Sequence, residues 1–212
     1  MGNKKGRLEV VCGSMFSGKT EELMRRLRRA EYAKQNVLTI KHKIDNRAKR
    51  SCILSHDGRE RIAFTIDKRM KYLDKILELA NPNVEVVGID EVQFFPNEII
   101  KVICELVESG KRVIVTGLDL DFRGEPFGIV PLLLSIADEV TKLKAICVKC
   151  GKDSHHSQRI IDGKPASYDD PIIMIGASEC YEARCRDCFE IDKSARLNVN
   201  IQPLAKEVVR EA

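Results

Sequence analysis

No apolar segment of this 212-residue sequence approaches the length that spans a bilayer. The longest, around Ile129 to Ala137, contains Pro131 and Ser135, whereas a membrane helix needs roughly 20 apolar residues. The N-terminal residues MGNKKGRLEV lack the apolar core of a secretion signal, and Gly6 stands where myristoylation requires Ser or Thr. We therefore expect a soluble, cytoplasmic protein with no membrane partner.

A strong imbalance of charge is missing as well. The 36 basic and 32 acidic residues leave a net charge of only +4, and they are spread along the chain. A nucleic-acid-binding domain usually carries a concentrated basic surface, so charge gives no reason to expect a nucleic-acid partner. The 43% hydrophobic content and the length allow one solid core, or a main domain with a small attachment.

Apolar segments alternate with segments of helical period over the first half of the chain. We expect strands at 8–12, 37–40, 84–89 and 112–116, and helices at 21–34, 70–79 and 98–108. Strands that are almost wholly apolar and alternate with helices predict an α/β fold with a parallel sheet covered on both faces. The polar segment 45–60 predicts a mobile loop or an exposed hairpin. The composition changes near Lys144, so we expect a main domain over 1–143, a small domain over 144–192 and a loose tail over 193–212.

Residues 13–20 read GSMFSGKT, which fits the phosphate-loop pattern G-x-x-x-x-G-K-[ST] and lies between a predicted strand and a predicted helix. In such a loop, backbone N–H groups and the helix N-terminus bind phosphate, Lys19 holds the β- and γ-phosphates of ATP, and the Thr20 hydroxyl binds Mg²⁺. The alternative is a glycine-rich turn with an exposed lysine. The predicted phosphate-binding residues are Gly13, Ser14, Met15, Phe16, Ser17, Gly18, Lys19 and Thr20.

Two carboxylates follow the apolar strand that ends near residue 89. Asp90 is the expected Mg²⁺ partner, through water. Because successive strand residues point to opposite sides, Glu91 should not share this role unless the strand ends there. Glu91 could accept the proton of an attacking hydroxyl in a phosphotransferase, or that of water in an ATPase. The plainer alternative is that both are strand-end carboxylates in solvent.

The cysteines form two C-x-x-C pairs, with residues 151–184 between them. A chain without an export signal occupies a reducing compartment, where paired cysteines hold metal more often than they form disulfides. Four thiolates make a closed tetrahedral site, which indicates structural Zn²⁺. A redox pair, or competition from His155 and His156 as ligands, is the alternative. The predicted zinc ligands are Cys147, Cys150, Cys185 and Cys188.

These motifs occur together in one known family. The segments GSMFSGKTEELMRR, KHKIDNR, IDEVQFFP, GLDLDFRGEPFG and ECYEARCRDC, with the two cysteine pairs, closely resemble the cytosolic, zinc-containing (type II) thymidine kinases. The resemblance runs in order from about Leu8 to Phe189. It implies a P-loop NTPase-like (RecA-like) fold with a small zinc-bound lid. It also implies transfer of the ATP γ-phosphate to the 5′-hydroxyl of thymidine, a step of nucleotide salvage for DNA synthesis.

The resemblance assigns roles to individual residues. Glu91 matches the general base, Arg47 a group near the transferring phosphate, and Gln93 joins Asp90 in the nucleotide site. The zinc-held loop closes over the base largely through main-chain groups, with the Tyr181 hydroxyl a partner for the sugar 3′-oxygen. From the residues alone, core packing is the alternative for each aromatic. The residues expected around the nucleoside are Met15, Phe94, Leu118, Phe122, Phe127, Ser157, Ile172, Met174, Gly176 and Tyr181.

The family also implies a homotetramer and feedback inhibition by thymidine triphosphate bound in the nucleoside site. Arginines 25, 26, 28 and 29 are typical of it, and we expect them on a solvated or subunit-facing helix surface. Cys180 and Ser157 depart from its usual residues, which bears on substrate affinity. Two other functions stay open from the residues alone: an ATPase acting on nucleic acid, and a zinc-ribbon binding module that senses nucleotide. Both require salt-dependent DNA binding, whereas a kinase does not.

Overall fold

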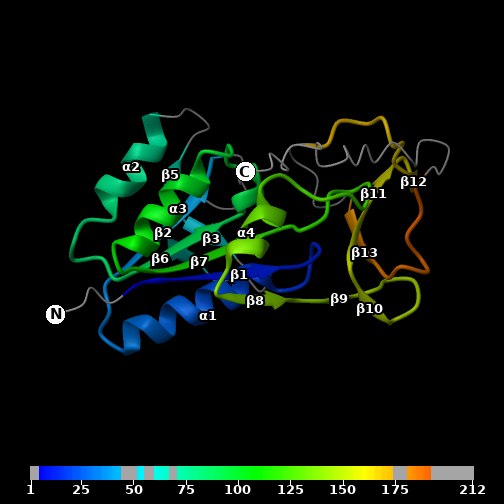
Figure 1. Ribbon diagram of the computed structural model, residues 1–212. Helices are drawn as coiled ribbons and strands as arrows, with labels where there is room; N and C mark the ends of the chain where they lie inside the picture. Colours follow the sequence, from blue (N-terminus) through cyan, green and yellow to red (C-terminus); the bar gives the residue numbers. More distant parts are fainter. Residues whose placement is uncertain (1–4, 44–51, 55–59, 67–70, 174–180, 192–212) are drawn as a thin grey trace, which may run out of the picture.

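The computed structural model describes residues 5–43, 52–54, 60–66, 71–173 and 181–191. Its centre is a six-stranded sheet in which every neighbouring pair of strands is parallel (Figure 1). The strand order is β5 (Phe64–Ile66), β2 (Val37–His42), β6 (Val86–Asp90), β7 (Arg112–Gly117), β1 (Arg7–Cys12) and β8 (Glu139–Lys142). The α/β fold class and the parallel sheet are thus confirmed.

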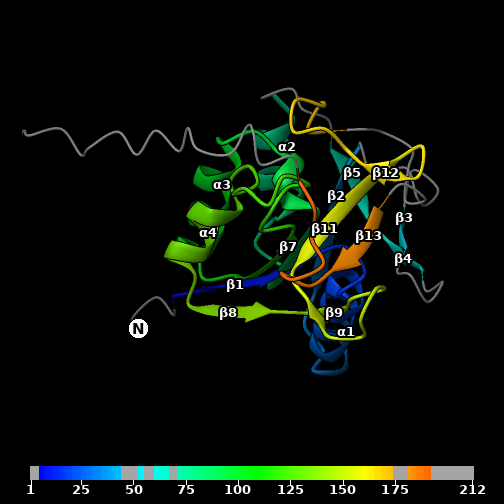
Figure 2. The same ribbon diagram turned by 90° about the vertical axis from the view of Figure 1, so that its right-hand side faces the viewer.

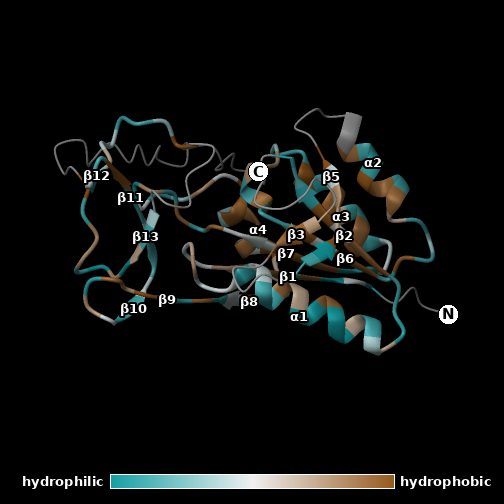
Figure 3. Ribbon diagram, turned by 180° about the vertical axis from the view of Figure 1, so that it is seen from behind, coloured by the Kyte–Doolittle hydropathy of each residue, from teal (hydrophilic) through white to brown (hydrophobic). Residues whose placement is uncertain are grey.

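Helices cover both faces of this sheet. Helix α1 (Lys19–Tyr32) lies on one face, while α2 (Lys71–Leu79), α3 (Ile99–Glu108) and α4 (Val130–Ile136) lie on the other (Figures 1 and 2). Figure 3 shows mainly hydrophobic central strands, whereas α1 carries many hydrophilic residues. Among the described residues, no helix is both long enough and apolar enough to cross a membrane.

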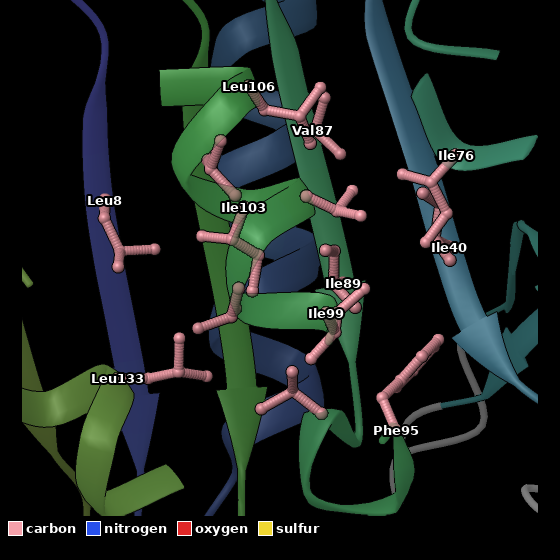
Figure 4. Packing of buried hydrophobic residues seen from close by; sticks show 14 of the residues in the cluster. Leu8, Ile40, Ile76, Val87, Ile89, Phe95, Ile99, Ile103, Leu106 and Leu133 are labelled. Atoms are coloured by element: carbon pink, nitrogen blue, oxygen red, sulfur yellow. The ribbon is translucent and has the colours of Figure 1, made fainter. Parts of the chain in front are cut away.

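The alternation of side chains along the strands produces two separate cores. Val87 and Ile89 of β6 face α3, where they meet Ile99 and Ile103 (Figure 4). Val86, the residue before them, faces α1 on the opposite side of the sheet. Together the two cores bury almost every apolar side chain of the central strands, as expected for strands covered on both faces.

Segment 45–60, predicted as a mobile loop or an exposed hairpin, lies partly outside the described residues. Its described part contains β3 (Cys52–Leu54), which pairs antiparallel with β4 (Glu60–Ile62). The expectation of an exposed hairpin is wrong at Ile53, which is fully buried against α1. The sequence pattern missed this contact because one apolar residue in a polar segment has no period.

Short strands form the part of the chain that carries the cysteine pairs. They are β9 (Ala145–Ile146), β10 (Asp153–Ser154), β11 (His156–Ile161), β12 (Lys164–Pro165) and β13 (Tyr181–Arg184). Two small antiparallel sheets result, β10-β9 and β12-β11-β13, and they lie to one side of the central sheet (Figure 1). We refer to residues 144–191 as the cysteine module. The predicted tail beyond residue 192 lies outside the described residues.

A buried carboxylate anchors α1 to the sheet. Glu9 of β1 is 1% exposed and lies close to three guanidinium groups, those of Arg26 (2.7 Å), Arg112 (2.6 Å) and Arg7 (2.8 Å). Burial raises the pKa of the Glu9 carboxyl, but the hydrogen bonds and charges of these arginines lower it overall. The expectation that Arg26 lies on a solvated or subunit-facing surface is therefore wrong, because Arg26 is buried in this cluster.

Replacing Glu9 by Gln should lower the free energy of unfolding at neutral pH by about 3 kcal/mol, because the buried Arg26 and the partly buried Arg112 would each lose the buried carboxylate that they share. Since the pKa of Glu9 in the folded state lies below its ordinary value of 4.5, its carboxylate stabilises the fold above that pH. This stabilisation is lost as the pH falls through the lower folded-state pKa. Urea unfolding of the wild type and Glu9→Gln at neutral and acidic pH should show the difference shrinking on acidification.

Glu139 supplies the matched control. It pairs with the same Arg26 at 3.0 Å, but its side chain is 50% exposed. Glu139→Gln should therefore change the free energy of unfolding by less than about 1 kcal/mol. Equal losses in the two variants would show that burial of the Glu9 charge is not the source of its stabilisation.

Candidate active site and metal centre

The predicted phosphate loop connects β1 to α1. Its first glycine, Gly13, has a φ of +143°, and a Cβ atom there would lie 2.4 Å from the carbonyl oxygen of Leu143. Gly18 adopts the left-handed conformation immediately before α1. The loop closes around Lys19, whose ammonium group donates a hydrogen bond to the Ser14 carbonyl at 2.8 Å. The backbone conformation at positions 13 and 18 therefore favours glycine, and the loop between β1 and α1 has a defined structure.

The polar atoms of this loop fit an anionic ligand. The hydroxyl oxygens of Ser14 and Ser17 are buried and have no hydrogen-bond partner among the described residues. Unsatisfied buried hydroxyls are costly unless a ligand or water completes them. The N-terminus of α1, with its free N–H groups and positive dipole end, lies at the same place. Phosphate oxygens would satisfy these donors together.

Asp90 is the last residue of β6 and is 1% exposed. The Thr20 hydroxyl donates to its Oδ2 at 3.2 Å, and the Thr116 hydroxyl donates to its Oδ1. The Asp90 carboxylate therefore lies at the start of α1, next to Thr20, the other residue predicted to bind Mg²⁺. Carboxylate and hydroxyl oxygens are ligands that Mg²⁺ accepts, so these two side chains fit that ion. The sequence reading missed Thr116, although its place at the end of a neighbouring parallel strand was a signal.

Glu91 lies outside the strand, which resolves the geometrical question that the sequence left open. Strand β6 ends at Asp90, and Glu91 takes a left-handed conformation with a φ of 53°. Its backbone N–H donates to Asp90 Oδ1 at 3.0 Å, and its side-chain Oε2 accepts a hydrogen bond from Gln93 Nε2 at 2.5 Å. Gln93 Oε1 in turn accepts from the Leu118 N–H at 3.2 Å. The Glu91 side chain is thus buried, and its hydrogen bond with Gln93 orients it. This argues against the alternative of a strand-end carboxylate in solvent.

Aromatic side chains lie next to this carboxylate. Phe94, at the end of the short helix η1 (Val92–Phe94), meets Phe127 edge to face with 6.0 Å between ring centroids. The ring centroid of His42, at the end of β2, lies 6.2 Å from that of Phe94. Phe94 and Phe127 are only half-buried, so ordinary core packing does not fully cover them. Phe122, in contrast, is 3% exposed.

A nearby cysteine, Cys12, lies at the end of β1 beside this site. Burial raises the pKa of its thiol to about 11, and the neighbouring Asp119 carboxylate adds to the increase. The thiol is therefore neutral at physiological pH and is a core side chain rather than a nucleophile. Asp119 pairs with Lys142 at 2.7 Å, which links the loop after β7 to the end of β8.

The cysteine module reaches the phosphate loop directly. The Ser157 hydroxyl accepts a hydrogen bond from the Met15 N–H at 2.9 Å. Tyr181 accepts one from Arg159 Nε at 2.8 Å. Ile172 is 41% exposed, and its carbonyl binds the Arg159 guanidinium. The structure thus brings two predicted nucleoside residues, Ser157 and Met15, into contact, while Arg47, Met174 and Gly176 lie outside the described residues.

Two arginines of this region have partners that the sequence did not indicate. Arg123 donates to the Asp170 carbonyl at 2.9 Å and lies over the Tyr168 ring. Arg159 is fully buried, and no pattern in the sequence indicates this. A lone arginine in a polar segment carries no periodic signal, so only the tertiary structure reveals its surroundings.

The four predicted zinc ligands form one cluster. The sulfur atoms of Cys147, Cys150, Cys185 and Cys188 all lie within 4.8 Å of one another, and this is the metal-capable group found among the described residues. Zn–S bonds of about 2.3 Å in a tetrahedron place sulfur atoms roughly 3.8 Å apart, so the cluster fits Zn²⁺. Backbone hydrogen bonds from Gly151 to Cys147 and from Cys188 to Cys185 close the turn of each pair. A closed set of four thiols leaves no position for substrate, which indicates a structural zinc.

The fold and these sites define a class: a phosphate-loop α/β nucleotide-binding enzyme with an attached zinc-capable module. The family model described as thymidine kinase matches residues 6–189, which is most of the chain. The protein therefore belongs to the thymidine kinase family, and its four-cysteine cluster is that of the zinc-containing type II members. It is an enzyme that phosphorylates thymidine, with thymidine and ATP as the substrates of its family.

Replacing Cys185 by Ser should remove the bound zinc, because the remaining three thiols leave the tetrahedral site open. Elemental analysis of dialysed protein should find about one zinc per chain in the wild type and much less in the variant. The variant should also unfold at lower temperature, since a structural zinc contributes on the order of 10 kcal/mol to small zinc domains. Cys104→Ser, in α3 and outside the cluster, should retain the metal. Equal zinc content in both variants would contradict the assignment.

Proposed function

We propose that this enzyme transfers the γ-phosphate of ATP to the 5′-hydroxyl of thymidine, with Glu91 as the general base. The observation that supports this most directly is the turn after β6, which places Asp90 against Thr20 of α1 and Glu91 against Gln93. One strand end thereby presents one carboxylate to the phosphate loop and the other to the aromatic residues. A hydroxyl acceptor held between them would lie close to both groups.

The chain's own groups account for each requirement of phosphoryl transfer. The phosphate loop binds and orients the phosphates through its backbone N–H groups, Ser14 and Ser17, and Lys19 carries the positive charge opposite them. Lys19 is bound to Ser14 here, so it must exchange that carbonyl for a phosphate oxygen. Glu91 accepts the proton of the 5′-hydroxyl as the new O–P bond forms, while the bond from the γ-phosphorus to the bridging oxygen breaks and ADP leaves. Arg47 is proposed as a further cation at the transferring phosphate.

Thr20 and Asp90 are the residues proposed to hold Mg²⁺ with ATP. When bound there, the ion would neutralise negative charge on the phosphates of ATP. Thr116 orients Asp90 through its hydroxyl, and the backbone N–H of Glu91 donates to the same carboxylate oxygen, Oδ1. The zinc site is separate from this chemistry, because its four thiols come from the turns that directly follow β9 and β13.

The nucleoside is proposed to occupy the space between the aromatic residues and the cysteine module. Phe94, Leu118 and Phe127 lie on the main domain beside Glu91, and Ser157 and Tyr181 approach from β11 and β13. In this proposal, residues 1–143 form the nucleotide-binding domain and 144–192 a lid over the base. Feedback inhibition by thymidine triphosphate in the same site, a homotetramer and a cytoplasmic location belong to the proposal as properties of the family.

Glu91→Gln should lower kcat for thymidine by about 100- to 10,000-fold, the usual contribution of a general base. The amide keeps the size of the side chain and can still bind Gln93, so ATP should bind with unchanged affinity. The measurement is ATP-dependent formation of thymidine monophosphate, with deoxycytidine and water as competing acceptors, beside direct ATP titration.

Glu98→Gln, an exposed carboxylate at the start of α3, is the control and should retain full activity. A Glu91→Gln enzyme as active as this control would remove the general-base role. ATP hydrolysis without nucleoside product in the wild type would instead favour an ATPase that uses Glu91 on water. Salt-dependent DNA binding would then identify the nucleic-acid substrate.

Asp90→Asn should weaken the response to Mg²⁺ by about 10- to 100-fold, since a carboxylate that orients or binds the metal is lost. Titration of activity with MgCl₂ at fixed ATP and thymidine measures this shift. In Asn, the side-chain oxygen can still accept from Thr116 and from the Glu91 N–H, and the amide group can donate to the Thr20 hydroxyl, so thermal unfolding should change little. An unchanged Mg²⁺ dependence would place the ion elsewhere.

A further inference from the structure

Arg159 is a fully buried arginine in the middle of β11, and its guanidinium binds three oxygens from two separate segments. Nε donates to the Tyr181 hydroxyl at 2.8 Å, and the two terminal nitrogens donate to the carbonyls of Pro171 and Ile172. Pro171 and Ile172 precede residues 174–180 in the sequence, and Tyr181 follows them. One side chain therefore joins the two ends of this stretch of the module.

The Arg159 charge is stabilised by aromatic rings rather than by a carboxylate. Its Cζ lies 3.8 Å from the Phe122 ring centroid and 5.3 Å from that of Tyr181. Among the residues that the structure describes, no carboxylate forms an ion pair with it. A buried cation needs such compensation, and stacking on aromatic faces provides it. Because Phe122 belongs to the loop after β7, Arg159 also connects the module to the main domain.

The direction of β11 places Arg159 on the side that faces the main domain. Residues two apart on a strand share a face, so Ser157 and Arg159 project together. Ser157 binds the Met15 N–H of the phosphate loop, and Arg159 covers Phe122. The intervening Gln158 points the other way and accepts a hydrogen bond from the Glu190 N–H at 2.8 Å. One face of β11 therefore touches both the phosphate loop and the loop of Phe122.

The hydrogen bond from Arg159 also determines how Tyr181 can act. An arginine has donors only, so the phenol oxygen accepts from Nε and its own O–H must donate elsewhere. No described residue accepts that proton. A lysine could not replace this arrangement, because the planar guanidinium fork reaches all three oxygens at once. Tyr181 is thereby prepared to donate a hydrogen bond to an acceptor atom of a ligand.

We propose that Arg159 is a positioning residue that fixes the Tyr181 hydroxyl as a donor to the sugar 3′-oxygen, and so makes the enzyme selective for nucleosides that carry this oxygen. The inference rests on the proposed function, since it assumes that the nucleoside lies between β13 and the aromatic residues. Arg159 does not touch the substrate itself; it acts through Tyr181 and through the backbone at residues 171–172.

The test compares thymidine with 3′-deoxythymidine, which lacks the 3′-oxygen, in the wild type, Arg159→Lys, Tyr181→Phe and the double variant. The wild type should prefer thymidine in kcat/KM, and each single variant should reduce this preference by up to about tenfold, the size of one uncharged hydrogen bond. The loss should appear mainly in KM for thymidine, with KM for ATP unchanged. The double variant should lose no more than Tyr181→Phe alone, because both changes remove the same interaction.

Arg184→Lys is the control, since Arg184 is another buried arginine of the module and binds Glu182 rather than Tyr181. It should keep the wild-type preference, and zinc content should be equal in all variants. If Arg159→Lys retains zinc and the full preference, the positioning role is overturned. If Arg159→Lys does not fold, an unaltered preference in Tyr181→Phe overturns it equally. A wild type that phosphorylates neither nucleoside would refute the proposed function instead, which keeps the two failures distinct.

Discussion

The bond from the Glu91 N–H to Asp90 Oδ1 closes the turn on which the site depends. A strand that continued by one residue would direct Glu91 to the opposite face of the sheet from Asp90. The left-handed conformation at Glu91 costs about 1–2 kcal/mol for a residue with a Cβ. Hydrogen bonds from Gln93 and to Asp90 offset this cost. Two neighbouring carboxylates can therefore take separate proposed tasks, one at the metal and one at the acceptor hydroxyl.

The position of α1 relative to β6 supports this turn. A Cβ atom on Gly88 would lie 2.7 Å from a methyl group of Leu27, so glycine at this position leaves room for the Leu27 side chain between α1 and β6. Glu9 holds the same helix through Arg26 on the face toward β1. With α1 set in this way, Thr20 at its start reaches Asp90 at the end of β6.

The cysteine module contacts the central sheet and its loops at several points. The chain enters it from β8, which is paired in the central sheet, and the backbone at Leu143 lies against Gly13. The Ser157 hydrogen bond and the Arg159 stack on Phe122 follow along β11. The cysteine cluster at the far side of these contacts stabilises short strands that have little core of their own. A metal is an effective replacement for such a core in a domain this small.

The sequence alone was sufficient for the parts of this protein that depend on local or periodic patterns. Apolar strands alternating with helices indicated the parallel sheet, and GSMFSGKT indicated the phosphate loop. Two cysteine pairs indicated the metal site, because the spacing within each pair is typical of metal ligands. Strands β5 and β8 and helix α4 were not predicted, because they are short and partly exposed. The buried environments of Glu9, Ile53 and Arg159 depend on contacts with residues far away in the sequence. Only the tertiary structure decided these, since the burial of a charge or a lone apolar residue is determined by what packs against it and leaves no period in the chain.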